Sequence, residues 1–179
     1  MKGNGNSVST LFRKLYFFLL PTSGLRSRYV KKHQHLFHNI GDGIFFQPRN
    51  FPSDPELISI GNNVKIAADV TFINHDVVSY MLNTKFNCKD FQPLRGCIEI
   101  GNNVMIGAGV RILPNVRIGN NVIIGAGATV TKDIPDNSVA AGIPCKVIGG
   151  FDDFVKRRRG VSGVADKNLW EVFCLSRKG

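Results

Sequence analysis

The fold is decided by one stretch of the chain, residues 98–130, which read IEIGNNVMIGAGVRILPNVRIGNNVIIGAGATV. A β-branched apolar residue returns every six positions in this stretch: Ile100, Ile106, Ile112, Ile118, Ile124 and Val130. A second apolar residue follows each of these by four positions: Val104, Val110, Val116, Val122, Ala128 and Ile134. Because positions i and i+4 share one face of an extended chain, this pattern predicts short strands whose apolar residues point to one side.

Glycine and asparagine occupy the positions between the predicted strands. The sequence Ile-Gly-Asn-Asn-Val occurs at 60–64, 100–104 and 118–122, and the last two copies are 18 residues apart. Both residue types enter left-handed backbone conformations readily, so the chain can turn after each strand. Three units of six residues return the chain to its starting side. We therefore expect a mainly β fold, a parallel β-helix shaped as a three-sided prism with isoleucine and valine along its axis.

The six-residue spacing extends upstream and is interrupted once. An earlier copy is formed by Ile60, Ile66 and Phe72, and a weaker one begins at Ile40. Residues 78–97 contain no six-residue unit, so we expect them to leave the prism as an extruded loop. Loops of this length are usually functional or disordered. The aromatic residues of this loop indicate an ordered arm: Tyr80, Phe86 and Phe91.

The two ends of the chain differ in character from the repeats. Residues 7–38 predict one or two helices with basic residues on the surface: Arg13, Lys14, Arg26, Arg28, Lys31 and Lys32. The apolar run 15–20 is too short to span a hydrocarbon core of about 30 Å. We expect it to lie on an amphipathic helix packed on the domain, with contact to the inner face of a membrane as the alternative. Residues 151–159 carry acids first and bases last, an order that favours a helix.

These patterns predict three parts: a basic helical segment over 1–38, the β-helix over 39–149, and a short helix with a tail over 150–179. In the tail, an apolar group indicates a segment that docks elsewhere: Trp170, Val172 and Phe173.

The composition excludes several classes of protein. With 43% hydrophobic residues the chain is not disordered, and its 19 glycines lack the three-residue period of collagen. The net charge of +10 lies mainly in the terminal segments and accompanies no nucleic-acid-binding motif, so we do not expect nucleic acid as a partner. The four cysteines are scattered, which favours reduced thiols, a cytoplasmic location and no metal.

With these repeats the chain resembles the hexapeptide-repeat acyltransferases, whose fold is a left-handed parallel β-helix. The resemblance is best over 98–148, and the pattern is closest to the galactoside/maltose and xenobiotic O-acetyltransferase branch. It implies a homotrimer that binds acetyl-CoA, with active sites between neighbouring subunits. In such enzymes the extruded arm lies against a neighbouring subunit beside the acceptor pocket.

Acyl transfer to a hydroxyl needs a base, donors for the developing oxyanion and a site for the coenzyme. Histidine suits the role of base because its ordinary pKa is near 6.5. Of the four histidines only His75 lies within the repeats, at the end of a coil and just before the predicted loop. The resemblance places the catalytic histidine at this position, so we predict His75 as the general base. Asn74 or Asp76 could orient its imidazole or bind the acceptor, although both are also ordinary turn residues.

The resemblance also implies a coenzyme-binding set. Small residues at one prism edge would admit the pantetheine arm, and basic residues would meet the phosphates: Met105, Ala108, Ala126, Thr131, Lys132 and Lys146. Two positions depart from the family pattern. Met105 stands where a tryptophan is common, and Gly149 stands where a second basic residue is common. Lys156 or a residue of 157–159 could replace that second base.

The expected function is therefore acetyl-CoA-dependent O-acetylation of a sugar or polysaccharide precursor. An antibiotic hydroxyl, an amino-sugar amine or serine are alternative acceptors, and a non-catalytic β-helix scaffold is the alternative of a different class. A zinc-dependent carbonic anhydrase of this fold would need three histidines, and the repeats contain one. A sugar nucleotidyltransferase would need a further nucleotide-binding domain, which 38 leading residues cannot supply.

Overall fold

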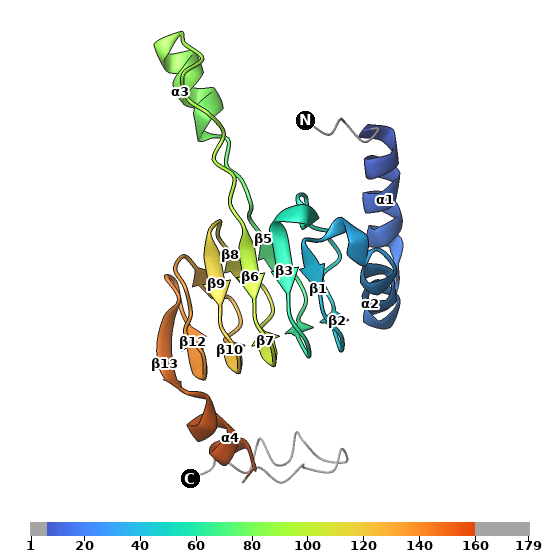
Figure 1. The fold of residues 1–179 in the computed structure, drawn as a ribbon, viewed down its shortest axis with the longest axis vertical. Helices are drawn as coiled ribbons and strands as arrows, with labels where there is room; N and C mark the ends of the chain where they lie inside the picture. Colours follow the sequence, from blue (N-terminus) through green and yellow to red (C-terminus); the bar gives the residue numbers. More distant parts are fainter. Residues whose placement is uncertain (1–6, 160–179) are drawn as a thin grey trace, which may run out of the picture.

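The computed structural model of the protein describes residues 7–159, and its central body is a stack of coils that runs from β1 to β13 (Figure 1). Three sheets form the sides of the stack. The first contains β1 (Asn39–Ile40), β3 (Ile58–Ile60), β6 (Ile98–Ile100) and β9 (Val116–Ile118). The second contains β2 (Phe45–Phe46), β4 (Lys65–Ile66), β7 (Val104–Ile106), β10 (Val122–Ile124), β12 (Ser138–Ala141) and β13 (Lys146–Gly150). The third contains β5 (Thr71–Phe72), β8 (Arg111–Ile112) and β11 (Thr129–Val130).

Strand pairing follows the predicted six-residue period. All neighbouring strands are parallel except β12 and β13, which are antiparallel. Ile100 pairs with Ile118 and Ile106 with Ile124, so one coil advances the chain by 18 residues. The leading and following apolar residues of the repeats are buried, except Ile44 and Phe72, which are half-buried. The prediction of a parallel β-helix with an isoleucine and valine axis is confirmed.

The edge between the first and second sheets explains the Gly-Asn-Asn sequence. We call it the asparagine edge: Asn62, Asn63, Asn102, Asn103, Asn120 and Asn121. The second asparagine of each pair has a positive φ, as at Asn103 (57°), and makes the turn. The first asparagine accepts through its side chain from the coil before it, as when Asn102 Oδ1 takes the backbone N–H of Asn62 at 2.8 Å. Gly101 is needed because a Cβ there would lie 2.8 Å from the backbone of Gly119.

The N-terminal segment forms two helices and a short 3₁₀ turn at the β1–β2 end of the stack (Figure 1). These are α1 (Ser7–Leu19), α2 (Ser23–Lys32) and η1 (Gln34–Leu36). Phe17 of α1 and Val30 of α2 are fully buried, and Phe17 packs edge-on against Phe46 and Phe51. Aromatic packing therefore joins the helices to the first coil.

One basic residue of this segment is not on the surface as expected. Arg26 is only 5% exposed, and its Nη1 donates to the carbonyl of Leu20 at 2.6 Å. The prediction was wrong because Arg26 lies on the inner face of α2, where its guanidinium satisfies a carbonyl at the end of α1. Burial lowers the pKa of Arg26.

Helix α3 (Val78–Phe86) lies in the segment between β5 and β6, within the range predicted as a loop. The segment leaves the coils beside His75 and returns beside Arg95, which form an antiparallel bridge, and α3 lies at its far end (Figure 1). We call residues 76–95 the arm. After β13 the chain forms α4 (Phe151–Arg159), with Asp152 and Asp153 in its first turn. The tail group Trp170, Val172 and Phe173 lies outside the described residues.

Candidate active site

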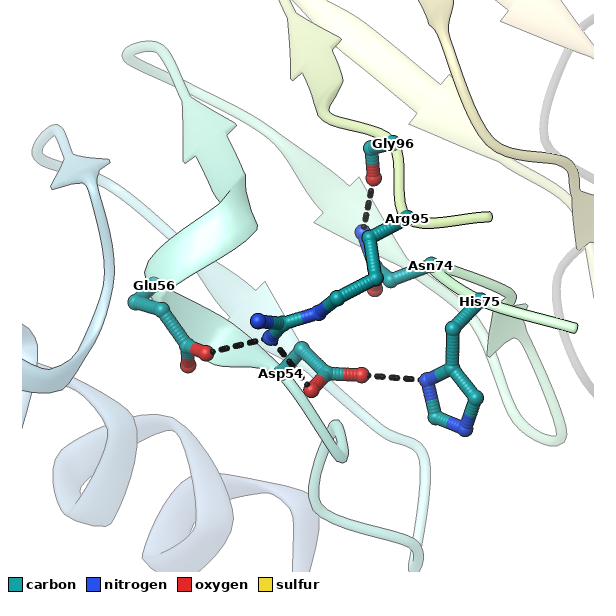
Figure 2. Close-up of polar contacts among 6 residues, drawn as sticks. All are labelled: Asp54, Glu56, Asn74, His75, Arg95 and Gly96. Carbon is teal, nitrogen blue, oxygen red and sulfur yellow. Dashed lines mark hydrogen bonds and ion pairs between the residues drawn. The ribbon is translucent and has the colours of Figure 1, made fainter. Parts of the chain in front are cut away.

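His75 stands at the edge between the third and first sheets, where the arm leaves the coils. We call this edge the histidine edge; its turns are 53–57, 73–75, 113–115 and 131–133. Strand β5 ends at Phe72, and Ile73 continues the ladder by donating to Ile112. The imidazole that follows is half-exposed, with 46% of the side chain accessible. A polar cluster lies on the Nδ1 side of the ring (Figure 2).

Asp54 orients the imidazole. Its Oδ2 lies 2.6 Å from His75 Nδ1, and its side chain is 17% exposed (Figure 2). An ionised carboxylate can only accept, so Nδ1 carries the proton and Nε2 of the neutral ring keeps its lone pair. Within residues 7–159 Nε2 has no hydrogen-bond partner. This arrangement leaves a basic nitrogen free to take a proton from a substrate.

Arg95 holds the other side of Asp54. Its Nη2 donates to Asp54 Oδ1 at 2.9 Å and to Glu56 Oε1 at 3.0 Å (Figure 2). The hydrogen bond that Arg95 donates to Asp54 raises the pKa of Arg95, so the guanidinium remains a cation. Because Arg95 belongs to the returning end of the arm, this contact links the arm to the coil that carries Asp54. Two carboxylates therefore face one guanidinium.

The other two residues predicted beside His75 take part in the base of the arm. Asn74 is 2% exposed, and its Nδ2 donates to the carbonyl of Gly96 at 3.0 Å, while Gly96 N–H donates back to the Asn74 carbonyl at 2.7 Å. Asp76 Oδ1 accepts from the backbone N–H of Val78 at 3.1 Å, at the start of α3. Neither side chain contacts the imidazole in this structure, where Asp54 is its partner.

Sequence reasoning missed Asp54, Glu56 and Arg95. A usable signal was present for Asp54. Counting six residues on from Phe46 reaches Pro52, which is buried, so residues 53–57 occupy the same edge as 73–75 one coil later. The loss of isoleucine and valine over 47–57 hid this count. Arg95 had no such signal, because its position depends on the path of the arm.

The small residues predicted to bind coenzyme lie on another edge. Ala108 and Ala126 follow β7 and β10 and are exposed on what we call the alanine edge, between the second and third sheets. They stack directly, since the N–H of Gly127 donates to the carbonyl of Ala108 at 2.8 Å. A Cβ on Gly107 would lie 2.5 Å from the backbone nitrogen of Ala126. Met105 is 43% exposed on the adjacent second sheet.

The polar and basic coenzyme candidates divide between the two edges. Thr131 and Lys132 follow β11 on the histidine edge and are exposed. The backbone N–H of Leu113 donates to the carbonyl of Val130, and that of Ile73 donates to the carbonyl of Ile112. Leu113 therefore lies one coil from Ile73 and one coil from Thr131. Thr131 and Ile73 are two coils apart, about 10 Å at the usual strand spacing. Lys146 opens β13 and pairs with Ala141, past the last coil of the second sheet. One chain therefore brings Lys132 toward His75 and Lys146 toward the end of the alanine edge.

Comparison with known proteins finds a matching family model and similar chains. Residues 97–132 match the family described as bacterial transferase hexapeptide, six repeats. This match and those below confirm the resemblance to hexapeptide-repeat acetyltransferases, and likeness to their structures implies a left-handed β-helix.

Individual proteins give a more detailed comparison than the family model. The chain is 48% identical to protein CapG of Staphylococcus aureus over 105 residues, which covers 58% of this chain and 59% of that protein. It is 46% identical to galactoside O-acetyltransferase of Escherichia coli K12 over 101 residues, or 56% and 47% of the two chains. A solved structure of a galactoside acetyltransferase in complex with coenzyme A superimposes with a TM-score of 0.60 at 28% identity, covering 93% of this chain and 90% of that one. The matches span about half the length of the curated relatives.

Proposed function

We propose that the protein is an acetyl-CoA-dependent O-acetyltransferase that acts on a hydroxyl of a sugar or polysaccharide precursor. One observation carries the proposal: a half-exposed histidine at the base of the arm, with Nδ1 bound to a carboxylate and Nε2 free. The similarity to galactoside acetyltransferases, one of them bound to coenzyme A, supports the choice of donor and acceptor.

In the proposed reaction the acceptor hydroxyl lies against Nε2 of His75. The imidazole takes the hydroxyl proton as the oxygen attacks the thioester carbonyl, and a backbone N–H stabilises the oxyanion. The C–S bond then breaks, and the proton on Nε2 passes to the leaving sulfur. The products are an acetyl ester and free coenzyme A, and no covalent acyl-enzyme is required. Asp54 stabilises the imidazolium between the two steps.

The position of the two edges supports an assembly of chains. The histidine and alanine edges of one chain lie on opposite sides of the third sheet, about 20 Å apart for a face of six residues. A neighbouring chain could bring its alanine edge to His75, and the proposed homotrimer would then contain an active site between each pair of subunits. In this arrangement Met105, Ala108 and Ala126 contact the coenzyme arm, while Lys132 and Lys146 meet its phosphates.

The proposed location is cytoplasmic, with peripheral contact at the inner face of a membrane through the N-terminal segment. None of the helices within residues 7–159 has both the length and the apolar character needed to cross a bilayer.

An acceptor panel tests the proposed function. The purified protein is incubated with acetyl-CoA and, separately, a galactoside, a glucoside, an amino sugar, serine and an alcohol-bearing antibiotic, and acetylated products are measured by mass spectrometry. We expect an acetyl ester on a sugar hydroxyl. An amide on the amino sugar, or an ester on serine or the antibiotic, would assign one of the alternative acceptors. Failure to bind acetyl-CoA, together with no transfer, would favour the scaffold.

The basic residues give a second test. Replacing Lys132 and Lys146 with alanine is expected to raise the KM for acetyl-CoA by roughly tenfold or more, because each lysine loses a charged contact with phosphate. The KM for the acceptor should stay the same. Lys31→Ala, at the other end of the coils, is the matched control. A change confined to the acceptor KM would show that the coenzyme does not reach these lysines.

A further inference from the structure

Helix α1 presents a broad apolar face to solvent. Six large hydrophobic side chains are between 47% and 67% exposed: Leu11, Phe12, Leu15, Tyr16, Phe18 and Leu19. At 3.6 residues per turn they occupy one continuous arc of about 160° around the helix. Phe17 and Leu20 point to the other side and are buried. Contiguous exposed apolar surface of this kind marks an interaction site in soluble domains.

The segment that carries this face contains basic residues and no acidic ones. No Asp or Glu precedes Asp42, whereas this part of the chain carries several cations: Lys2, Arg13, Lys14, Arg26, Arg28, Lys31 and Lys32. Arg28 and Lys32 of α2 are exposed. Lys31 is paired with Asp42 at 2.7 Å, and Arg26 is buried. A partner of this surface therefore has to be both apolar and anionic.

A cavity beside the apolar face adds a second observation. It has a volume of about 540 Å³ and lies between α1 and α2. Arg13, Arg28 and Lys32 line it with three cations, and Tyr16 and Tyr29 add two phenolic groups. No carboxylate is among the described residues that line it. Tyr16 and Phe12 belong to both the cavity and the apolar face, so the two features are continuous.

We propose that this surface docks on an anionic phospholipid bilayer. The apolar face of α1 lies in the boundary between headgroups and acyl chains, as amphipathic helices do at interfaces. The cavity receives a headgroup phosphate, which the guanidinium and ammonium groups neutralise. A second copy of this chain fits less well, because meeting through this face would bring two acid-free, cationic segments together. The inference uses none of the residues around His75, so it stands apart from the proposed chemistry.

Vesicle binding tests the proposal with the full chain. Cosedimentation is measured with vesicles of phosphatidylcholine alone and of phosphatidylcholine with about one third phosphatidylglycerol. We expect binding to the anionic vesicles at least tenfold tighter than to neutral ones. The variant Phe12→Glu with Leu15→Glu should lose binding by tenfold or more, because two anchoring side chains no longer enter the bilayer. Arg28→Gln with Lys32→Gln should lose the preference for anionic lipid and keep the weak neutral binding.

The control variant is Ile148→Glu, which changes an equally exposed apolar residue on β13. It should bind vesicles as the unchanged protein does. Circular dichroism and acetyl transfer to a soluble acceptor show that each variant is folded. Vesicle binding that survives Phe12→Glu with Leu15→Glu would overturn the proposal, as would an unchanged protein that ignores anionic vesicles. A fall in oligomer size in that variant, without vesicle binding by the unchanged protein, would assign the face to a second copy.

Discussion

Replacing His75 with alanine is expected to lower kcat for acetyl transfer by about 10²–10⁴-fold, the usual contribution of a general base. Within the polar cluster, Nε2 of His75 is a basic nitrogen without a hydrogen-bond partner. The carboxylates of Asp54 and Glu56 both accept from Arg95. Affinity for coenzyme A, measured by calorimetry, should stay within a factor of about two because His75 is not among the residues proposed to contact the coenzyme.

The matched control is His38→Ala, which removes an exposed histidine near the start of the coils. This variant should turn over at the rate of the unchanged protein. If His75→Ala also retained full kcat with a measured acceptor, His75 would not be the base, and the proton would have to leave by another route.

The second large effect is expected for Asp54→Asn. An asparagine can turn its amide N–H₂ toward Nδ1, which favours the ring tautomer with the proton on Nε2 and removes the lone pair that faces the acceptor. We expect kcat to fall by about 10²-fold or more with little change in either KM. The measurement is steady-state kinetics with both substrates varied. Asp54 is a positioning residue, so its effect should appear in kcat even though it does not touch the substrate.

Glu56→Gln provides the comparison for Asp54. Glu56 contacts Arg95 but not His75, and its loss leaves the Asp54–His75 bond in place. We expect a change of less than about threefold in kcat. Equal losses in the two variants would mean that the whole cluster acts only by fastening the arm, and the orienting role of Asp54 would be wrong. Thermal unfolding of both variants separates this case from simple destabilisation.

The fold could be read from the sequence because the β-helix repeats its chemistry locally. Each coil needs buried apolar residues, such as Ile100 and Ile106, and a turn residue with a positive φ, such as Asn103. The same pattern therefore recurs in every coil, and each copy strengthens the prediction from the others. The division of side chains between core and surface follows from that period. The prediction for Arg26 was wrong because a basic residue normally indicates solvent, and the carbonyl of Leu20 that it satisfies lies just beyond the end of α1.

Only part of the site could be predicted from the sequence. His75 could be predicted because it is the one histidine in the repeats and stands where they break off. Its partner could not be chosen, since Asn74 and Asp76 are adjacent in sequence whereas Asp54 is 21 residues away. Contacts across coils depend on how many residues each turn contains, and the turn before β3 departs from the regular count. Arg95 depends in addition on the return path of the arm.

The packing of the N-terminal helices against the first coil affects how separate molecules associate. A stack of parallel strands has no natural end, because the last coil exposes backbone groups that can pair with another chain. Helix α2 packs against β2, and η1 against β1, at one end. At the other end β13 runs antiparallel and α4 follows it. We expect these caps to hinder the addition of further coils from neighbouring molecules, and therefore end-to-end growth of the prism into a fibre.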